Sequence, residues 1–587
     1  MMNRDTRLPG YLTFFRTAFA VFLGLGLLTQ HPSRVLGQDA NSALSSSKYY
    51  GAMKAGPRQF RFLIELNESD GTGKLISLDE GKREFPLEGV TLNDDKLRFE
   101  LKVSKATYEG ELTKSGQYEG WWKQSGGSFA LNFRPVSAMP EFEYTAIWEG
   151  QINLVVQKLN LRVRELKSGE VYLDSVTQLA GGFVAKKEVE GDQITIEVPS
   201  LGAKFTGTLN ESQDAIEGTW KQGFVSVSLV LKKASLEESL ESEAPDRPQT
   251  PKAPFPYSVE EVDIPNAQAG VRLAGTLTIP KNESRPGVAI LISGSGPQDR
   301  DESLMNHKPF WVIADHLSRN GIAVLRFDDR GVGKSTGDFS KATTLDFVSD
   351  VEAVVKFLKE DTRLDSQKIG LVGHSEGGII APLVAEKDSD VRFIVMLAGP
   401  GVNGKEISVD QADAILRASG VSGENRDRQR KIQAILLRLA EQKPALSEED
   451  YKSQALAEIE PLLTDNEKSK NAGKEMVDVA VAQVLTPWFN FFLTHEPAPV
   501  LEKLTCSVLA LNGEKDLQVT PELNIPAIQK ALEKAPTKDF EVIELDGLNH
   551  LFQKCRTGLV TEYGELTETF NSAALDKMSA WIKERTK

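Results

Sequence analysis

The chain has 587 residues, too many for one ordinary domain, and 40% of them are hydrophobic and 26% charged, as in a typical globular protein. The formal net charge of −15 argues against a nucleic-acid partner, because phosphate binding requires a basic surface. Only two cysteines are present, so a disulfide-rich scaffold is excluded. We expect two separate thiols, because Cys506 should begin a strand and Cys555 should lie beyond the far end of its neighbour.

The first 37 residues have the features of a secretory signal peptide. Three arginines precede a short apolar run at 17–28, and the small residue Gly37 follows at a suitable cleavage point. The alternative is an uncleaved membrane anchor, but the run is well short of the roughly 20 apolar residues that span a bilayer. We therefore expect cleavage of residues 1–37, export to the periplasm or the exterior, and no stable membrane insertion.

Residues 45–235 show a duplicated pattern of short strands. Apolar and polar residues alternate between Gly, Asn and Asp turns, which is typical of half-buried antiparallel strands. The two copies, 45–136 and 142–235, share motifs in the same order: 108–112 (YEGEL) with 205–209 (FTGTL), and 118–124 (YEGWWKQ) with 216–222 (IEGTWKQ). Each copy predicts an up-and-down β-meander, and the pair would pack as two small barrels or as one composite sandwich.

The tryptophans of the repeats allow two interpretations. Trp122, Trp148 and Trp220 would either stack on a sugar or line a lipid pocket, or they would fill the core between the strands. The second interpretation, that the tryptophans fill the core, is favoured, because no histidine, cysteine or carboxylate pair recurs in the two copies to indicate chemistry. The sequence therefore assigns the repeats no ligand.

From residue 257 the pattern changes to apolar strands that alternate with amphipathic helices. The preceding stretch, 236–256, is acidic and then proline-rich, which predicts a semi-extended linker at a domain boundary. The alternation over 257–587 predicts a mainly parallel sheet covered on both faces, and its interruption between about 401 and 500 predicts a helical cap. The expected strands are 288–292, 323–325, 369–372, 393–397, 507–511 and 540–545, and the expected helices are 308–320, 345–359 and 376–387.

A Gly-x-Ser-x-Gly motif, Gly373–Gly377, stands at the end of the expected strand 369–372 and directly before a helix. At such a turn the serine is strained and its hydroxyl is exposed, while small flanking residues let neighbouring backbone pass closely. The helix N-terminus also favours developing negative charge. The motif alone is common, but its place between strand and helix makes Ser375 the candidate nucleophile.

A serine nucleophile needs a base, and only His495 and His550 follow Ser375 in the chain. His495 falls in the predicted cap. His550 follows the strand 540–545, where an enzyme with the order nucleophile, acid, base would carry its histidine. We therefore predict that His550 takes the proton of Ser375.

The acid should hold the imidazole in its productive tautomer and stabilise the imidazolium. Asp516 is the preferred candidate, because it follows the strand 507–511 and comes from a loop separate from that of His550. Asp546 is the competitor, since it is close to His550 in sequence, and Glu514 ranks third.

The oxyanion hole requires two backbone amides. One should belong to Glu376, the residue after the nucleophile, and the other to the loop that follows strand 288–292. In that loop Ser295 and Gly296 are both candidates, with Ser295 slightly favoured. The polar residues 298–301 that follow would either shape the site or form a solvated turn.

Aromatic residues in the cap are candidates for an apolar substrate pocket. They are Trp488, Phe489 and Phe492, and the alternative is that they form the core of a cap helix. No metal or cofactor is expected, since no His or Cys pair has ligand spacing. The segment Gly331–Ser335 looks like the end of a phosphate-binding loop, but that motif requires glycine at 328, which is aspartate here.

Several motifs of the second region together resemble the α/β-hydrolase esterases that are grouped with the serine aminopeptidase-like hydrolases. The likeness covers about 257–587, and it rests on 293–301 (SGSGPQDRD), 327–335 (FDDRGVGKS), 373–377 (GHSEG), 487–489 (PWF), 513–516 (GEKD) and 548–552 (LNHLF). It implies the α/β-hydrolase fold and a short-chain acyl ester as substrate. The chain departs from many relatives by having Ser293–Gly294 in the oxyanion loop, where they have His-Gly.

The expected reaction is therefore acyl transfer to water from a small-molecule ester, with an acylated carbohydrate as one candidate. Alternatives within the fold are a serine exopeptidase or amidase and an acyltransferase, since the fold supports all of these chemistries. An alternative of another class is a ligand-binding protein that functions through its repeats, with a degenerate hydrolase domain. The sequence does not predict an oligomeric state.

Overall fold

The computed structural model divides the chain into two compact units, one ending at Pro245 and one starting at Asp246. The predicted signal peptide lies outside the described residues. The structure describes residues 46–587 except 56–57, 68–71, 80–82, 94, 102–105, 115, 125–126, 137–143, 154–157, 177–179, 223–224, 237–246, 442–446, 465–467, 469–471 and 485.

The first sequence repeat forms a closed barrel of eight antiparallel strands. Each strand pairs with the next along the chain, and β1 pairs with both β2 and β8, which closes the sheet. Closure leaves no strand edge unpaired around the ring. The strands are β1 (Ser46–Ala55), β2 (Arg58–Asn67), β3 (Thr72–Ser77), β4 (Arg83–Leu92), β5 (Lys96–Leu101), β6 (Ala106–Leu112), β7 (Tyr118–Gln124) and β8 (Gly127–Pro135).

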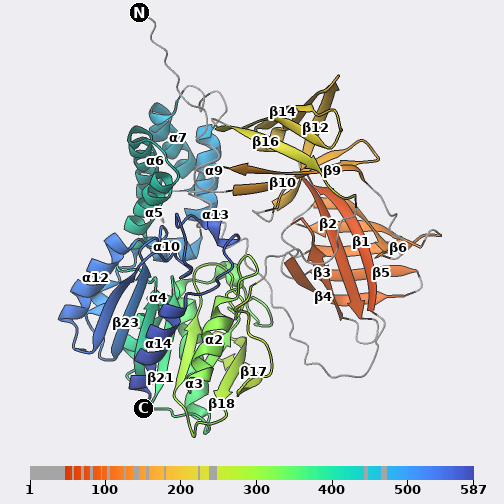
Figure 1. Ribbon diagram of the computed structural model, residues 1–587. Coiled ribbons are helices and arrows are strands. Elements are labelled where there is room, and N and C mark those ends of the chain that lie inside the picture. Colours follow the sequence, from red (N-terminus) through yellow and green to blue (C-terminus); the bar gives the residue numbers. More distant parts are fainter. Residues whose placement is uncertain are drawn as a thin grey trace, which may run out of the picture. The chain divides into compact units, whose positions relative to one another are not determined.

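The second repeat closes in the same way, with β9 pairing with β16 and β12 with β13. The duplicated meander is therefore confirmed, and of the two arrangements left open the structure has two barrels. The strands are β9 (Tyr144–Asn153), β10 (Lys158–Leu166), β11 (Val171–Ser175), β12 (Ala180–Glu190), β13 (Gln193–Val198), β14 (Ala203–Leu209), β15 (Ala215–Gln222) and β16 (Val225–Lys233) (Figure 1).

Alternating side chains fill the barrel interiors. On β5, Leu97, Phe99 and Leu101 are buried, while Arg98 is exposed and Glu100 is half-buried. The three tryptophans considered as ligand platforms, Trp122, Trp148 and Trp220, are at most 5% exposed and belong to the two core clusters. They therefore act as core aromatics, because a stacking platform must present its ring to solvent.

A buried ionic network joins the two barrels. The carboxylate of Asp79, which follows β3, accepts from Arg61 of β2 at 2.6 Å and lies 3.5 Å from Arg164 of β10. Arg164 in turn donates to Asp174 of β11 at 2.7 Å. Burial alone would raise the pKa of Asp174, but the charge and hydrogen bond of Arg164 hold it well below its usual range.

The second unit is built on an eight-stranded sheet, and its order is β17-β18-β20-β19-β21-β22-β23-β24. The strands from β20 to β24 run parallel, and the hairpin β17–β18 is antiparallel at one edge. This confirms the mainly parallel sheet. The strands are β17 (Tyr257–Asn266), β18 (Val271–Pro280), β19 (Val288–Ile292), β20 (Ala323–Phe327), β21 (Ile369–His374), β22 (Val391–Leu397), β23 (Ser507–Gly513) and β24 (Phe540–Leu545).

Helices cover both faces of this sheet, as Figure 1 shows. One apolar core lies between the sheet and α3 (Thr344–Glu360), α4 (Gly377–Lys387) and α12 (Pro521–Lys534). A second core lies under α2 (Pro309–Arg319) and α14 (Ser572–Arg585) on the other face. The central strands are buried on both sides, which explains their continuous apolar sequences.

The predicted cap interrupts the sheet between β22 and β23. Its helices have their own apolar core, which includes Ile432, Leu436 and Tyr451. They are α5 (Gly404–Ala418), α6 (Gly423–Glu441), α7 (Glu448–Ile459), α9 (Ala472–Val484) and α10 (Pro487–Thr494), followed by the short α11 (Ala498–Leu501). Within the part of the chain that the structure describes, no helix is both long and apolar enough to cross a bilayer.

The end of the predicted linker is ordered, which the sequence did not lead us to expect. Arg247 is only 6% exposed, and its guanidinium donates to the backbone carbonyls of Met305, Gly564 and Leu566. Gln249 bonds the backbone at Thr569 and Phe570. Residues 247 and 249 are thus part of the second unit, and hydrogen bonds hold them in place.

Candidate active site

Ser375 lies on a sharp turn between β21 and α4. Its φ of 51° is in the left-handed region, which a residue with a side chain adopts only under strain. The turn is crowded, because a Cβ atom at Gly373 would stand 1.9 Å from the carbonyl oxygen of Gly377, and one at Gly377 would stand 2.2 Å from that of Ile292. Both glycines of the motif are therefore required for the backbone to pass.

His550 and Asp516 form a buried pair at the ends of β24 and β23. His550 Nδ1 lies 2.8 Å from Asp516 Oδ2, and both side chains are at most 5% exposed. The other oxygen of Asp516 accepts from the amides of Gln518 and Val519 at 2.8 and 3.0 Å. These bonds orient the carboxylate, and because a carboxylate only accepts, Nδ1 of His550 is the donor in the bond between the two side chains.

The two competing carboxylates lie elsewhere. Asp546 is exposed, and its backbone carbonyl oxygen accepts a hydrogen bond from Lys554 Nζ. Glu514 is also exposed and accepts from the amide of Gly547. His495, the other downstream histidine, lies at the end of α10 and stacks on Phe491. Among the acids weighed from the sequence, Asp516 is therefore the one in contact with His550.

A second pair of a histidine and a carboxylate, His374 and Glu302, was missed by the sequence reasoning. His374 connects the nucleophile turn to the His550 loop. His374 Nδ1 lies 2.8 Å from Glu302, and its Nε2 lies 3.0 Å from the carbonyl oxygen of His550. The Glu302 carboxylate and the carbonyl oxygen are both acceptors, so this arrangement places a donor at each ring nitrogen of His374 and favours the imidazolium. Burial opposes this charge, but the charge and hydrogen bond of Glu302 outweigh it and raise the pKa of His374.

Glu302 also holds the predicted oxyanion loop. It accepts from the amide of Gly294 at 2.9 Å, which removes that amide from the donors available to a substrate. Ser295 lines the same pocket as Ser375 and Glu376, whereas Gly296 is not among the lining residues. Of the two candidates left open, the geometry therefore favours Ser295 as the second oxyanion donor.

The polar segment 298–301 is buried, so the alternative of a solvated turn is wrong. Arg300 makes two bonds to the carboxylate of Asp328 at 3.0 and 2.8 Å. Asp329 accepts from the hydroxyl of Ser293 at 2.8 Å and from the amide of Gln298 at 2.9 Å. These contacts fix the loop that carries Ser295 to the end of β20.

The side chain of Glu376 connects the start of α4 to α3 and α10. Its carboxylate accepts from Thr344 of α3 and from the indole of Trp488 on α10, each at 2.7 Å. Burial raises the pKa of Glu376 to about 7, although both hydrogen bonds act in the opposite direction. The residue that would supply an oxyanion amide thus also ties the cap to the nucleophile turn.

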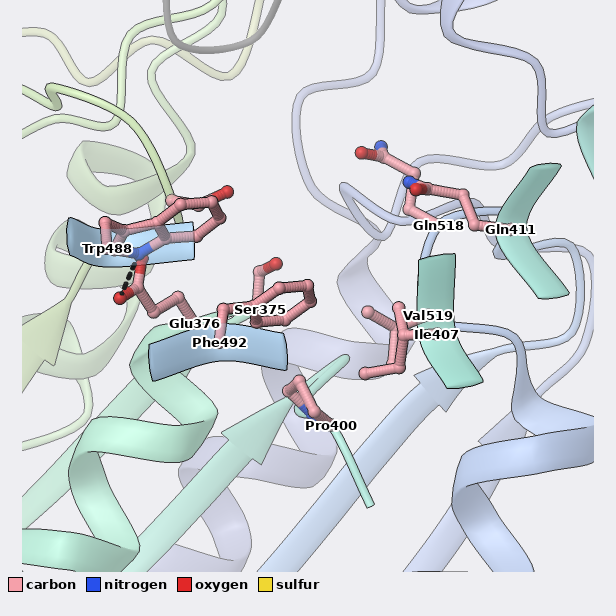
Figure 2. Close-up of a pocket in the computed structure, with 10 residues that line it drawn as sticks. Ser375, Glu376, Pro400, Ile407, Gln411, Trp488, Phe492, Gln518 and Val519 are labelled. Atoms are coloured by element: carbon pink, nitrogen blue, oxygen red, sulfur yellow. Dashed lines mark hydrogen bonds between the residues drawn. The ribbon is translucent and has the colours of Figure 1, made fainter. Parts of the chain in front are cut away.

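A small pocket, partly open to solvent, lies over Ser375 (Figure 2). Trp488 and Phe492 line it and stack with ring centroids 5.3 Å apart. Phe489, the third aromatic predicted for the pocket, packs instead in the cap core. Positions 488 and 492 are one helical turn apart and share a face of α10, whereas position 489 points elsewhere.

The segment that looks like a phosphate-binding loop encloses a carboxylate instead of a phosphate. The amide of Lys334 donates to the side chain of Asp328 at 3.0 Å, and the Lys334 ammonium pairs with Glu261. A carboxylate at this position would repel a phosphate. Among the described residues, no cluster of His, Cys, Asp and Glu side chains has a metal-binding arrangement.

Comparison with known proteins identifies the fold family of this unit. Residues 310–554 match the family model described as serine aminopeptidase, S33. This part of the chain is thus similar to that family. The match contains Ser375, Asp516 and His550, and an S33-type α/β-hydrolase agrees with the strand order described above. The resemblance drawn from the sequence is therefore confirmed.

Curated relatives cover only part of the chain. The esterase EstD of Thermotoga maritima is 28% identical over 297 residues, which are 50% of this chain and 61% of EstD. The uncharacterized protein YfhR of Escherichia coli K12 is 30% identical over 147 residues, which are 24% of this chain and 48% of YfhR. The chain thus spans less than two thirds of either relative.

Solved structures of α/β-hydrolases also resemble this chain. The Pyrococcus furiosus esterase Pf2001 is 14% identical, with 60% of this chain and 100% of that chain covered and a TM-score of 0.35. Est1E from Butyrivibrio proteoclasticus with bound ferulic acid is 19% identical, with 55% and 96% covered and a TM-score of 0.31.

Proposed function

We propose that this chain hydrolyses carboxylic esters, with Ser375 as nucleophile, His550 as base and Asp516 as the acid that orients it. The observation that carries the proposal is the buried 2.8 Å pair of His550 and Asp516, whose loop contacts the nucleophile turn through His374. The similarity to EstD, an esterase by name, favours esters over other acyl compounds.

The reaction divides into two acyl transfers. His550 Nε2 takes the proton of Ser375 as the hydroxyl attacks the ester carbonyl, and then gives that proton to the leaving alcohol. Water, deprotonated by His550, attacks the acyl-enzyme and releases the carboxylic acid. Throughout, Asp516 stabilises the imidazolium and keeps Nδ1 protonated.

The negative charge that develops on the carbonyl oxygen is stabilised by backbone amides. The donors we assign are those of Glu376, at the start of α4, and Ser295, in the loop after β19. Neither amide has a hydrogen-bond partner among the described residues, so both can bind an oxyanion without breaking an existing bond. The confined pocket beside Trp488 and Phe492 favours a short acyl chain.

Replacement of the nucleophile tests this proposal. We expect Ser375→Ala to lower kcat on p-nitrophenyl acetate by about 10⁴-fold or more. Ser579→Ala is a matched control, because Ser579 is a buried serine of α14 whose hydroxyl lies 3.0 Å from His316 Nε2. Ester hydrolysis retained in purified Ser375→Ala would refute the assignment, and a higher kcat/KM on aminoacyl p-nitroanilides than on esters would favour a peptidase.

A further inference from the structure

We propose that the pocket selects uncharged esters whose alcohol part carries a hydroxyl group, as in the esters of polyols and sugars. This inference rests on the proposed ester hydrolysis and extends it to the substrate class. The juxtaposition that carries it is a pair of glutamine amides at one end of the pocket and stacked aromatic rings at the other.

The two ends of the pocket differ in chemistry. Figure 2 shows Trp488 on one side of Ser375 and the amides of Gln411 and Gln518 on the other. Trp488 also bonds Glu376, whose own amide we assign to the oxyanion hole. The aromatic end therefore lies beside the carbonyl group, and we place the acyl part there because the alcohol part belongs to the side of His550.

The glutamine end belongs to the alcohol side. Gln518 is in the loop of Asp516. The backbone N–H of Gln518 donates to the Asp516 carboxylate at 2.8 Å, and Asp516 binds His550. His550 must protonate the leaving oxygen, so the alcohol part lies on the side of this loop. The hydroxyl of Thr520 in the same loop donates to Asp410 of α5 and thereby holds the neighbouring Gln411 in place.

The side-chain amide of Gln411 is available to a ligand in the pocket. Its side chain is only 4% exposed and lines the pocket, yet among the described residues no hydrogen-bond partner contacts it. Gln518 uses its NH₂ group on the hydroxyl of Tyr563 at 3.0 Å, which leaves its carbonyl oxygen as an acceptor. The Gln411 amide is open to the pocket, so an apolar alcohol part would displace water from it without replacing the lost hydrogen bonds. A ligand hydroxyl both donates and accepts and so can bond the two glutamines.

Charge at the pocket favours a neutral ligand. Of the ten residues that line it, Glu376 is the only ionisable one. Its carboxylate already accepts two hydrogen bonds, and burial raises its pKa to about 7. A permanently cationic alcohol would find no carboxylate among the lining residues at the glutamine end of the pocket, and an anionic one would find no lysine or arginine in the lining.

Two butyrate esters of similar size test the inference. We expect wild-type kcat/KM for 2-hydroxyethyl butyrate to exceed that for propyl butyrate by about tenfold or more, because the propyl ester leaves the glutamines unpaired. In Gln411→Met, which keeps the volume and removes the amide, the ratio should fall to about one. Butyrylcholine should show no advantage over the propyl ester.

Gln429→Met is the matched control. Gln429 is a buried glutamine of the cap helix α6 whose amide atoms also lack partners, but it does not line the pocket, so the ratio should stay as in wild type. A wild-type ratio near one, an unchanged ratio in folded Gln411→Met, or a preference for butyrylcholine would overturn the inference. Absence of hydrolysis of every ester would instead refute the proposed function.

Discussion

Replacing Asp516 by asparagine keeps the shape and position of the side chain but removes its negative charge from the proposed triad. In Asp516→Asn the amide oxygen can keep accepting from Gln518 and Val519, so the new NH₂ group faces His550 Nδ1. A donor there forces the proton of His550 onto Nε2, where no base remains. We expect kcat on p-nitrophenyl acetate to fall by about 10⁴-fold without loss of the fold, as judged by circular dichroism.

Asp546→Asn is the matched control for this prediction. Asp546 is exposed and precedes the His550 loop, so its variant should hydrolyse esters at the wild-type rate. Loss of activity in Asp546→Asn together with full activity in Asp516→Asn would reverse the assignment of the acid.

Glu376 gives the stability of the second unit a defined pH dependence. Its pKa is raised from 4.5 to about 7 because the carboxyl is buried, so between these values the folded chain keeps a proton that the unfolded chain has released. The stability contributed by the neutral carboxyl is therefore complete at low pH and is lost as the pH rises towards 7. In Glu376→Gln the side chain cannot ionise, and this loss disappears.

We therefore expect the free energy of unfolding of Glu376→Gln, relative to wild type, to increase as the pH rises from about 5 to about 8. Urea denaturation followed by circular dichroism at several pH values measures the difference. Glu283→Gln, a change at an exposed glutamate of the same unit, controls for loss of one negative charge. Parallel curves for Glu376→Gln and wild type would contradict the raised pKa.

The individual site residues that the sequence could predict are those marked by a short motif or by the strand that precedes them. Ser375 lies in a motif that spans five residues, and its positive φ and crowded glycines follow from that motif. The bond between Asp516 and His550 could be inferred from the strands that precede them. Glu302 could not be found in this way, because its contact with His374 joins residues from separate loops, and its contact with Gly294 lies within one irregular loop that has no periodic pattern.

At the scale of elements, the sequence predicted the positions of strands and helices, but it did not predict that the strands of each repeat close into a barrel. The expected strands 288–292 and 540–545 agree with β19 and β24. β19 is a buried parallel strand with an uninterrupted apolar run, whereas β24 is a half-buried edge strand whose apolar residues are interrupted by Glu541 and Glu544. The repeats, in contrast, left barrel and sandwich open. Closure requires β1 to pair with β8 as well as with β2, and hydrogen bonds between distant strands leave no periodic signal in either sequence.

The repeated Glu-Gly-x-Trp pattern has a physical reason that the structure makes visible. Gly110 pairs with Gly120 across β6 and β7, as Gly207 pairs with Gly218 across β14 and β15. In each pair a Cβ atom on the second glycine would stand 2.5 Å from the Cα atom of the first. The side chain of Tyr108 covers the first pair, so the motif marks a close approach of two strands beneath an aromatic ring and not a ligand site.

At the scale of the whole molecule, the ionic network between the barrels offers a test of how the first unit holds together. The Asp79 carboxylate is fully buried and faces both Arg61 and Arg164. Asp79→Ala would leave two buried guanidinium groups without this counter-charge. Removing one partner of a buried pair costs about 3–5 kcal/mol, and we expect a loss of this size in the free energy of unfolding of the first unit, measured by urea denaturation of the full chain.

Glu149→Ala is the control, because Glu149 pairs with Arg162 in the second barrel at 2.7 Å but is 46% exposed. Solvent screens such a pair, so its removal should cost at most about 1 kcal/mol. Ester hydrolysis at room temperature should be unchanged in both variants, since the proposed catalytic residues all belong to the second unit. If Asp79→Ala cost no more than Glu149→Ala, the network would not be what stabilises the junction, and the barrels would be held by their separate apolar cores alone.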